Sequence, residues 1–425
     1  MRIWLVKLDE PLRIDEGDPR PCRMGLIADA LHRRGHEVLW WTSTEYHQLK
    51  RQRFTRDTRI TVDDDYVLWL MHARPYRKNI SIGRMLHHRT LARKFLDIGQ
   101  REQRPDLILC ALPSLDMCQA AVKYGRSRGV PVVLDIRDLW PDIFPALLPR
   151  WARPLSKIAC LPFLRMVRMA CAGATGICGI TPGFVAWGLG YAQRRASEWD
   201  ASFFLGYPSR MPDAEAVAKA ADFWERLDVT TKCDGFRVCV IGALGERNER
   251  EVLAAIATAR RLPAVQFVFC GTGTNEAKYR ESAADAKNAI FAGWCGQAEL
   301  WTLMRYASVG LVPFQDTIDF RLSISNRAIE YLSAGLPIVS SAKGVLEDLL
   351  ASSGCGVTYA NGSAEDLCRT LSGLMNSPDK LRGMSVRAAK VFQDLFRAEV
   401  VYEAMADHLE SVAMAHTAGV DAAYA

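Results

Sequence analysis

The stretch Phe236-Arg-Val-Cys-Val-Ile-Gly242 opens a second series of alternating strands and helices in this chain of 425 residues. An apolar, β-branched run that ends in a glycine turn is typical of the first strand of a doubly wound α/β domain. A comparable run, Met1-Arg-Ile-Trp-Leu-Val6, starts the chain. Because a chain of this length suits two domains, the pattern predicts two Rossmann-like α/β domains that face a central cleft.

The alternation continues along both halves and sets the expected boundaries. Strands are expected at 3–8, 37–41, 66–71, 107–111, 131–135, 176–180, 202–205, 237–241, 265–270, 289–291, 309–312, 337–340 and 356–358. Helices are expected between them, for example at 21–34, 115–128, 249–261 and 364–375. We therefore expect an N-terminal domain over 1–206, a linker over 207–235, a C-terminal domain over 236–395, and a helix with a frayed tail over 396–425.

Composition excludes several classes of protein. With 49% hydrophobic and 24% charged residues, the chain is globular rather than disordered, and no apolar run is long enough to span a bilayer. The first residues show no signal-peptide pattern, and the 12 cysteines form neither C-x-x-C pairs nor metal-ligand clusters. We expect reduced thiols, no metal and a cytoplasmic location.

Glycine turns at predicted strand ends mark candidate phosphate sites, because glycine lets backbone N–H groups approach an anion closely. Gly17 follows the first strand, and Gly242 and Gly245 follow the strand at 237–241, with Arg247 and Arg250 just beyond. Such turns plus a forked cation suit a diphosphate. Ordinary βα turns with solvated arginines are the alternative.

Two more strand ends could contact a nucleobase. Gly271 and Gly273 follow the strand at 265–270, and Trp294 follows Phe291-Ala-Gly293. Backbone groups there could bind a base edge while the indole stacks on the ring; the alternative for Trp294 is simple packing.

Charged residues in two further segments are the strongest candidates. Asp135-Ile-Arg137-Asp138-Leu-Trp-Pro-Asp142 ends a buried strand, where charge is costly unless it is paired or functional. Asp138 could contact a sugar or could cap a helix. In Ser325-Asn-Arg327-Ala-Ile-Glu330, the acid could hold ribose hydroxyls and the arginine a phosphate, or the two could form a surface ion pair.

Taken together, R-D-L-W-P-D, the G-x-L-G turn, G-T-G, F-x-G-W and S-N-R-x-x-E-Y-L-x-x-G-x-P-I-V resemble the GT4 family of retaining glycosyltransferases with the GT-B fold. The similarity covers nearly the whole chain and is greatest to the branch of N-acetylfucosamine transferases of O-antigen and capsule synthesis. It implies that Gly17 lies near the donor phosphate and sugar, that Arg137 and Asp138 contact the donor sugar, and that Glu330 holds the ribose while Arg327 contacts phosphates.

The resemblance also implies the reaction: metal-independent transfer from a nucleotide-sugar, expected to be a UDP-sugar, without any other cofactor. The sequence departs from the family at two places. Leu322 stands where relatives carry the first glutamate of E-x7-E, and Glu246 stands where a basic residue is expected, so Arg247 or Arg250 would replace it.

Charge differs between the two halves. Residues 1–200 carry 32 Lys and Arg against 21 Asp and Glu, and the remainder carries 22 against 27. Basic residues interleaved with apolar ones over 74–104 and 145–173 suit the anionic inner leaflet of the plasma membrane and a lipid-diphosphate-linked or polysaccharide acceptor; a solvated basic face is the alternative. No nucleic-acid recognition motif accompanies them. An epimerase on the same fold and a catalytically weak partner subunit of another transferase remain competing functions.

Overall fold

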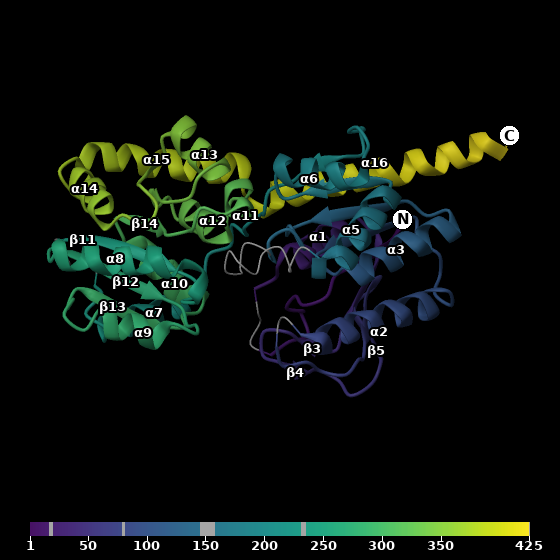
Figure 1. The fold of residues 1–425 in the computed structure, drawn as a ribbon, viewed down its shortest axis with the longest axis horizontal. Helices are drawn as coiled ribbons and strands as arrows, with labels where there is room; N and C mark the ends of the chain where they lie inside the picture. Colours follow the sequence, from purple (N-terminus) through teal and green to yellow (C-terminus); the bar gives the residue numbers. More distant parts are fainter. Residues whose placement is uncertain (17–19, 79–80, 145–157, 231–234, 425) are drawn as a thin grey trace. The chain divides into compact units, whose positions relative to one another are not determined.

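The computed structural model describes residues 1–16, 20–78, 81–144, 158–230 and 235–424. The chain forms two compact units (Figure 1). The first unit comprises Met1–Phe204 and Glu399–Ala425, and the second comprises Leu205–Ala398. The C-terminal helix therefore belongs to the same unit as the N-terminus.

An eight-stranded sheet of order β10-β9-β8-β7-β1-β2-β6-β5 forms the centre of the first unit. Every neighbouring pair is parallel except β5 and β6. The strands are β1 (Arg2–Val6), β2 (Glu37–Ser43), β5 (Thr58–Asp63), β6 (Tyr66–Met71), β7 (Leu107–Leu112), β8 (Val132–Ile136), β9 (Gly176–Gly179) and β10 (Ala201–Ser202). A small hairpin of β3 (Glu45–Tyr46) and β4 (Arg51–Gln52) follows β2.

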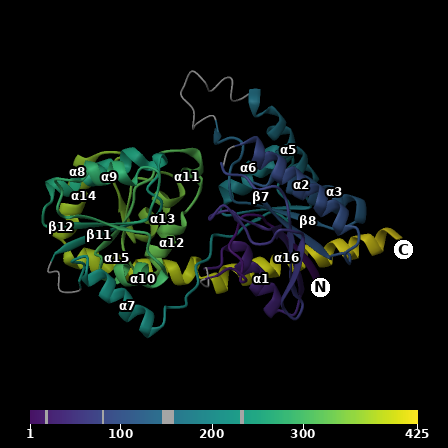
Figure 2. The same ribbon diagram turned by 90° about the horizontal axis from the view of Figure 1, so that it is seen from below.

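Helices cover both faces of this sheet (Figure 2). On one face α2 (Ile82–Gly99), α3 (Leu115–Arg128), α5 (Leu161–Gly173) and α6 (Pro182–Ala192) pack side by side in that order. On the other face lie α1 (Arg23–Arg33) and α16 (Ala398–Tyr424), which are tied by ion pairs from Arg34 to Glu403, Asp407 and Glu410.

Burial explains the strand order. The central strands β1 and β7 read as continuous apolar runs, because helices cover both of their faces. The edge strand β5 instead alternates between half-buried and exposed residues. The Trp4 side chain of β1 packs in the core, where the centroid of its ring lies 5.0 Å from that of Trp41 and 5.9 Å from that of Phe95.

The second unit holds a fully parallel sheet of order β13-β12-β11-β14-β15-β16, the doubly wound arrangement. Its strands are β11 (Phe236–Ile241), β12 (Val265–Cys270), β13 (Ala289–Gly293), β14 (Val309–Val312), β15 (Ile338–Ser340) and β16 (Gly356–Thr358).

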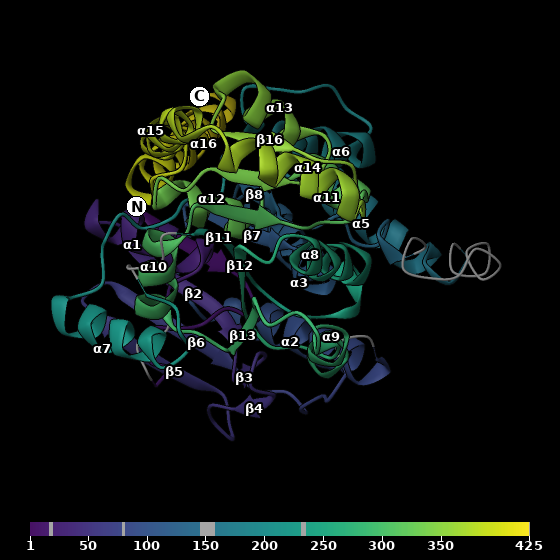
Figure 3. The same ribbon diagram turned by 90° about the vertical axis from the view of Figure 1, so that its left-hand side faces the viewer.

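Two helical layers enclose this second sheet, as Figure 3 shows. One layer contains α8 (Glu249–Arg261), α9 (Glu276–Ser282) and α14 (Ala364–Met375). The other contains α7 (Ala214–Glu225), α10 (Gln297–Tyr306), α12 (Asn326–Ser333) and α15 (Pro378–Leu395). The short elements η3 (Glu246–Asn248) and α11 (Ile318–Leu322) and the helix α13 (Val345–Ser353) complete the unit.

The structure differs from the expected boundaries at two places. Residues 207–230, expected as part of a linker, contain α7, whose Trp224 is fully buried and donates its indole N–H to the Glu299 carbonyl at 2.8 Å. This amphipathic helix therefore packs into the second unit. At the other end, α16 remains helical through Tyr424, where a frayed tail was expected, and Val412 and Ala413 are buried in the first unit.

The chain passes between the units twice, and the two passages are hydrogen-bonded to each other. The Tyr207 amide donates to the Phe396 carbonyl at 2.8 Å, and the Ala398 amide donates to the Tyr207 carbonyl at 2.9 Å. The two connecting segments thus lie side by side.

Candidate functional site

The position of α12 is set by one buried tyrosine. The Tyr331 hydroxyl accepts from the Ile241 amide at 2.9 Å and lies 3.0 Å from the Cys239 carbonyl, its acceptor on β11. Its ring lies against Gly310 of β14, where a Cβ atom would come within 2.4 Å of the ring. Strand β14 therefore needs glycine here, and the tyrosine fixes the start of α12 over the carboxyl end of β11.

This anchor brings Arg327 onto the first glycine turn of the second unit. Arg327 lies one helical turn before Tyr331, and a Cβ added to Gly242 would stand 2.0 Å from an Arg327 terminal nitrogen. Gly242 has a φ of +123°, a backbone conformation that residues with a Cβ rarely adopt. Glycine is thus required twice, for the turn and for the space that the guanidinium occupies.

Arg327 carries a positive charge that no carboxylate of the described residues neutralises at ion-pair distance. Its guanidinium lies 5.0 Å from the centroid of the Phe314 ring, and burial lowers the pKa of this group below its ordinary value. Glu330 lies on the same helix and is only 8% exposed. A half-buried cation held on an aromatic face is suited to receive an anionic ligand.

The neighbouring turns meet through backbone contacts that exclude side chains. A Cβ on Gly271 would lie 2.1 Å from the Gly242 carbonyl oxygen, and one on Gly273 would lie 2.4 Å from that of Leu244. Within the described residues, the amides of Ala243 and Gly245 donate to no acceptor. The predicted glycines are therefore brought together at the carboxyl ends of β11 and β12, with two backbone donors available.

Arg247 has a partner that the sequence did not indicate. It forms an ion pair with Asp319 of α11, and its guanidinium lies 4.4 Å from the centroid of the Phe320 ring. The Phe320 ring in turn stacks on Phe314 at 4.1 Å. Two stacked phenylalanines therefore lie between the Arg247 and Arg327 guanidinium groups.

The same helix contains Leu322, where the resemblance expected a glutamate. The acid on this helix is Asp319, one turn earlier, and it is engaged by Arg247 and by the Thr317 hydroxyl at 2.7 Å. Arg250 is exposed, and its side chain lies against Gly362.

Trp294 is 76% exposed, so it does not pack in the core, which was the alternative considered above. Its loop is joined to the glycine turns, because the Gly271 amide donates to the Gly293 carbonyl at 2.6 Å. The ring of Trp294 is therefore available for stacking beside the turns.

In the first unit, Arg137 belongs to a buried network of charges. Asp135, fully buried, accepts hydrogen bonds from Arg23 at 3.0 Å and from Arg137 at 2.6 Å, and Arg137 also pairs with Glu10. Burial alone would raise the pKa of Asp135, but the two guanidinium groups hold it well below its usual range. The sugar contact expected of Arg137 stays a prediction, and its observed contacts stabilise the fold.

The other two predicted residues of the first unit differ in what the structure describes. One Asp138 carboxylate oxygen accepts from the adjacent Leu139 amide at 2.8 Å, and the side chain is half-buried after β8. Gly17 lies outside the described residues. No set of three His, Cys, Asp or Glu side chains that could hold a metal ion occurs among the described ones.

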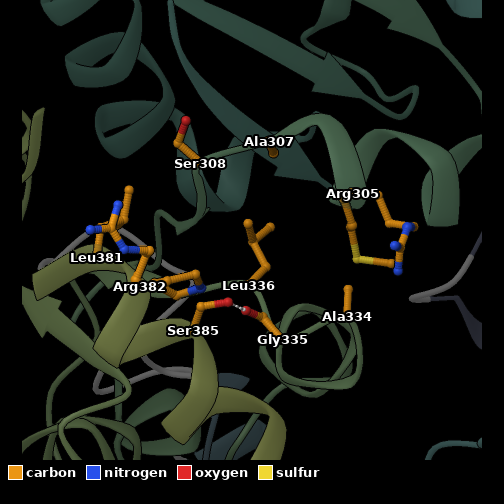
Figure 4. A pocket seen from close by; sticks show the side chains of 11 residues that line it. Arg305, Ala307, Ser308, Ala334, Gly335, Leu336, Leu381, Arg382 and Ser385 are labelled. Carbon is orange, nitrogen blue, oxygen red and sulfur yellow. Dashed lines mark hydrogen bonds between the residues drawn. The ribbon is translucent and has the colours of Figure 1, made fainter. Parts of the chain in front are cut away.

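A separate cavity of about 330 Å³ lies in the second unit, away from these residues (Figure 4). Ala307 and Ser308, which precede β14, and Leu336 and Pro337, which precede β15, line it. It therefore opens at the amino ends of the strands. Ligands of doubly wound sheets bind at the opposite, carboxyl ends.

Comparisons with known proteins agree with this arrangement. Residues 235–377 match the family model described as "Glycosyl transferases group 1". A search of curated proteins found no match. The chain is similar in structure to a sucrose-phosphate synthase from Thermosynechococcus elongatus (16% identity, TM-score 0.72, covering 97% of this chain and 99% of that chain).

Two further solved structures show the same similarity. Anabaena HepE, solved in complex with UDP, has 15% identity and a TM-score of 0.67 over 97% of this chain and 100% of that chain. An α,α-trehalose-phosphate synthase from Burkholderia vietnamiensis has 14% identity and a TM-score of 0.66 over 97% and 98%. The fold is that of the GT-B glycosyltransferases, which confirms the predicted fold class.

Proposed function

We propose that the chain transfers a sugar from a UDP-sugar to a lipid-linked or polysaccharide acceptor of bacterial surface polysaccharide synthesis, with retention of anomeric configuration and without a metal. The observation that carries this proposal is Arg327, which has no carboxylate partner among the described residues and lies against Gly242, within the stretch that matches the group 1 glycosyl transferase model. HepE, a protein of similar fold, was solved with UDP, which supports the choice of donor.

In this proposal, the donor diphosphate lies on the turn from Gly242 to Gly245. The amides of Ala243 and Gly245 and the Arg327 guanidinium stabilise the negative charge that develops as the bond between the sugar and the diphosphate breaks. The acceptor hydroxyl oxygen forms the new bond to the sugar, and its proton passes to the leaving diphosphate. Buried Glu330 holds the ribose hydroxyls.

The test combines binding and turnover. Thermal unfolding is measured with a panel of UDP- and GDP-sugars, because a ligand at 100 times its dissociation constant adds about 2.7 kcal/mol of stability. Glu330→Ala should lose the shift, whereas Glu365→Ala, an exposed glutamate on α14, should keep it.

Turnover then separates the alternatives. Release of UDP with transfer to an acceptor, unchanged by EDTA, supports the proposal, and the anomeric configuration of the product is read by NMR. Interconversion of one nucleotide-sugar into another would favour an epimerase. A well-folded sample that binds no nucleotide would contradict the proposal and favour a partner subunit.

We further propose that the first unit works at an anionic membrane surface. No helix among the described residues is long and apolar enough to cross a bilayer. On α2, Ile82 is 75% exposed and Leu86 60%, and on α5 Leu161 is 52% and Met169 65% exposed. Exposed arginines interleave with them, at 89 and 93 on α2 and at 165 and 168 on α5. This combination supports binding to anionic headgroups with shallow apolar insertion.

Vesicle sedimentation tests the membrane proposal. The chain should sediment with phosphatidylglycerol vesicles and not with phosphatidylcholine vesicles, and Met169→Glu should weaken sedimentation. Val386→Glu is the matched control, because Val386 is 72% exposed on α15 of the second unit. Equal loss in both variants, or no sedimentation of the wild type, would contradict it.

A further inference from the structure

A second group of charged side chains lies at the carboxyl ends of β1, β2 and β6 in the first unit, outside the donor site. Asp9 follows β1, His47 and Lys50 belong to the β3–β4 hairpin after β2, and Tyr76 follows β6. Arg84 comes from the first turns of α2, which runs close to this hairpin (Figures 1 and 3). In a doubly wound unit this is the edge at which ligands bind.

Direct contacts join these side chains into one cluster. His47 Nδ1 lies 2.6 Å from the Tyr76 hydroxyl and 3.1 Å from Lys50 Nζ, and Arg84 donates to the Asp9 carboxylate at 3.0 Å. The Tyr76 ring lies between cations, with its centroid 4.9 Å from Lys50 Nζ and 5.7 Å from the Arg84 guanidinium carbon.

Trp140, from the R-D-L-W-P-D segment that follows β8, also contacts the cluster. The centroid of its ring lies 5.3 Å from the Arg84 guanidinium carbon. The segment that the sequence singled out therefore contributes an aromatic ring here as well as charges to the buried network.

Among the described residues, the cluster carries more positive than negative charge. Lys7, at the end of β1, is half-buried, and its ammonium has no partner within the described residues. Although burial would raise the pKa of Asp9, the charges of Lys7, the nearby histidines and Arg84 lower it. Three cations therefore surround one ionised carboxylate. A further acid among the described residues, Glu45, is fully buried, accepts from Gln52 at 2.8 Å, and has its pKa raised by burial.

Backbone strain occurs at the same place. Asp9 has a φ of +67° and Lys50 a φ of +51°, in the left-handed region that residues other than glycine rarely adopt. Such conformations are strained and tend to persist at ligand sites. One anion and one cation of the cluster are thus held in strained backbone conformations at the ligand edge of the unit.

We propose that Lys7, Lys50 and Arg84 bind a phosphate group of the acceptor, an inference that rests on the proposed transferase function. A phosphate supplies the anionic partner that the Lys7 ammonium lacks among the described residues, and Tyr76 and His47 offer further hydrogen bonds. The phosphate belongs either to a lipid-linked acceptor or to a soluble phosphosugar, and the experiment distinguishes these sources.

Calorimetric titration of inorganic phosphate into the full chain, already saturated with UDP, tests the site. The wild type should bind phosphate, and Lys7→Met should weaken binding about tenfold or more. Lys7→Arg should restore binding, which would exclude loss of fold as the cause. Lys123→Met, an exposed lysine on α3, should leave it unchanged. Absence of phosphate binding up to about 10 mM, or equal binding by Lys7→Met, would overturn the inference.

Competition by candidate acceptors then identifies which kind of acceptor carries the bound phosphate group. Displacement of phosphate by polyprenyl phosphate in micelles assigns a lipid-linked acceptor, and displacement by a hexose 6-phosphate assigns a soluble one. Failure of both to compete overturns the acceptor role. UDP binding, measured first, keeps the two proposals apart: normal UDP binding without phosphate binding contradicts this inference alone, whereas no UDP binding contradicts the proposed function.

Discussion

Replacing Gly242 by alanine tests the donor site through geometry alone. The added Cβ would stand 2.0 Å from an Arg327 nitrogen and 2.8 Å from its guanidinium carbon, so the guanidinium must leave its position. Hydrogen bonds to charged groups contribute about 1.5–3 kcal/mol, and each 1.4 kcal/mol is tenfold in affinity. We therefore expect Gly242→Ala to bind UDP about 10- to 150-fold more weakly, measured by isothermal titration calorimetry.

A second glycine separates this effect from backbone strain. Gly335 has a φ of +66° at the end of α12, and a Cβ there would meet the Ala389 Cβ and two Ser385 oxygens at ordinary contact distances of 3.5–3.7 Å. Gly335→Ala should lower stability, as any side chain at positive φ does, but leave UDP affinity unchanged. In an Arg327→Ala background, Gly242→Ala should weaken binding no further. Wild-type affinity in Gly242→Ala, or equal losses in both glycine variants, would refute the reasoning.

Three other substitutions give distinct outcomes. Trp294→Ala should leave the thermal midpoint unchanged, because the ring is 76% exposed, yet weaken UDP binding about 2- to 13-fold through lost stacking; unaltered affinity would exclude the base contact. Tyr331→Phe should cost about 1–3 kcal/mol in urea unfolding, because the Ile241 amide loses its acceptor, and a smaller loss would show that water replaces the hydroxyl. Asp135→Asn should cost about 3–5 kcal/mol at neutral pH by leaving two buried arginines without their shared carboxylate. The pKa of Asp135 is lowered in the folded state, so its contribution to stability is present above the unfolded pKa of about 3.9 and is lost as the pH falls below that value. In a plot of unfolding free energy against pH, Asp135→Asn should therefore lose less stability at acid pH than the wild type. Equal losses at acid pH would contradict this.

Periodicity and turn residues predicted most of the fold. Helices at Leu115–Arg128, Glu249–Arg261 and Ala364–Met375 were predicted with the ends that the structure has, because glycines, prolines and charge patterns mark them. Trp224 shows the limit. Its helix is Ala-rich and amphipathic and follows two prolines, so only its contact with Glu299, 75 residues away, reveals that it belongs to the second unit. The antiparallel edge strand β5 was missed, although its alternation of half-buried and exposed residues is the pattern of an edge strand.

The glycine turns and Arg327 could be placed from local sequence because strand ends share an edge. Pairings between distant segments could not be predicted from local sequence. Arg247 meets Asp319 across 72 residues, and Arg137 meets Glu10 across 127. Whether such an arginine is bound to a carboxylate or available to a ligand depends on tertiary packing that spacing does not encode.

Because α16 completes the first unit, that unit is assembled from both ends of the chain. Val401, Met405 and Leu409 of α16 are buried, and Arg34 is paired to the helix through three carboxylates. During synthesis, part of the apolar surface of the first unit therefore stays uncovered until α16 has been made, whereas the second unit is continuous and can fold earlier. A stop codon before α16 would thus leave one face of the first unit's sheet partly uncovered, although every strand of that sheet had been made.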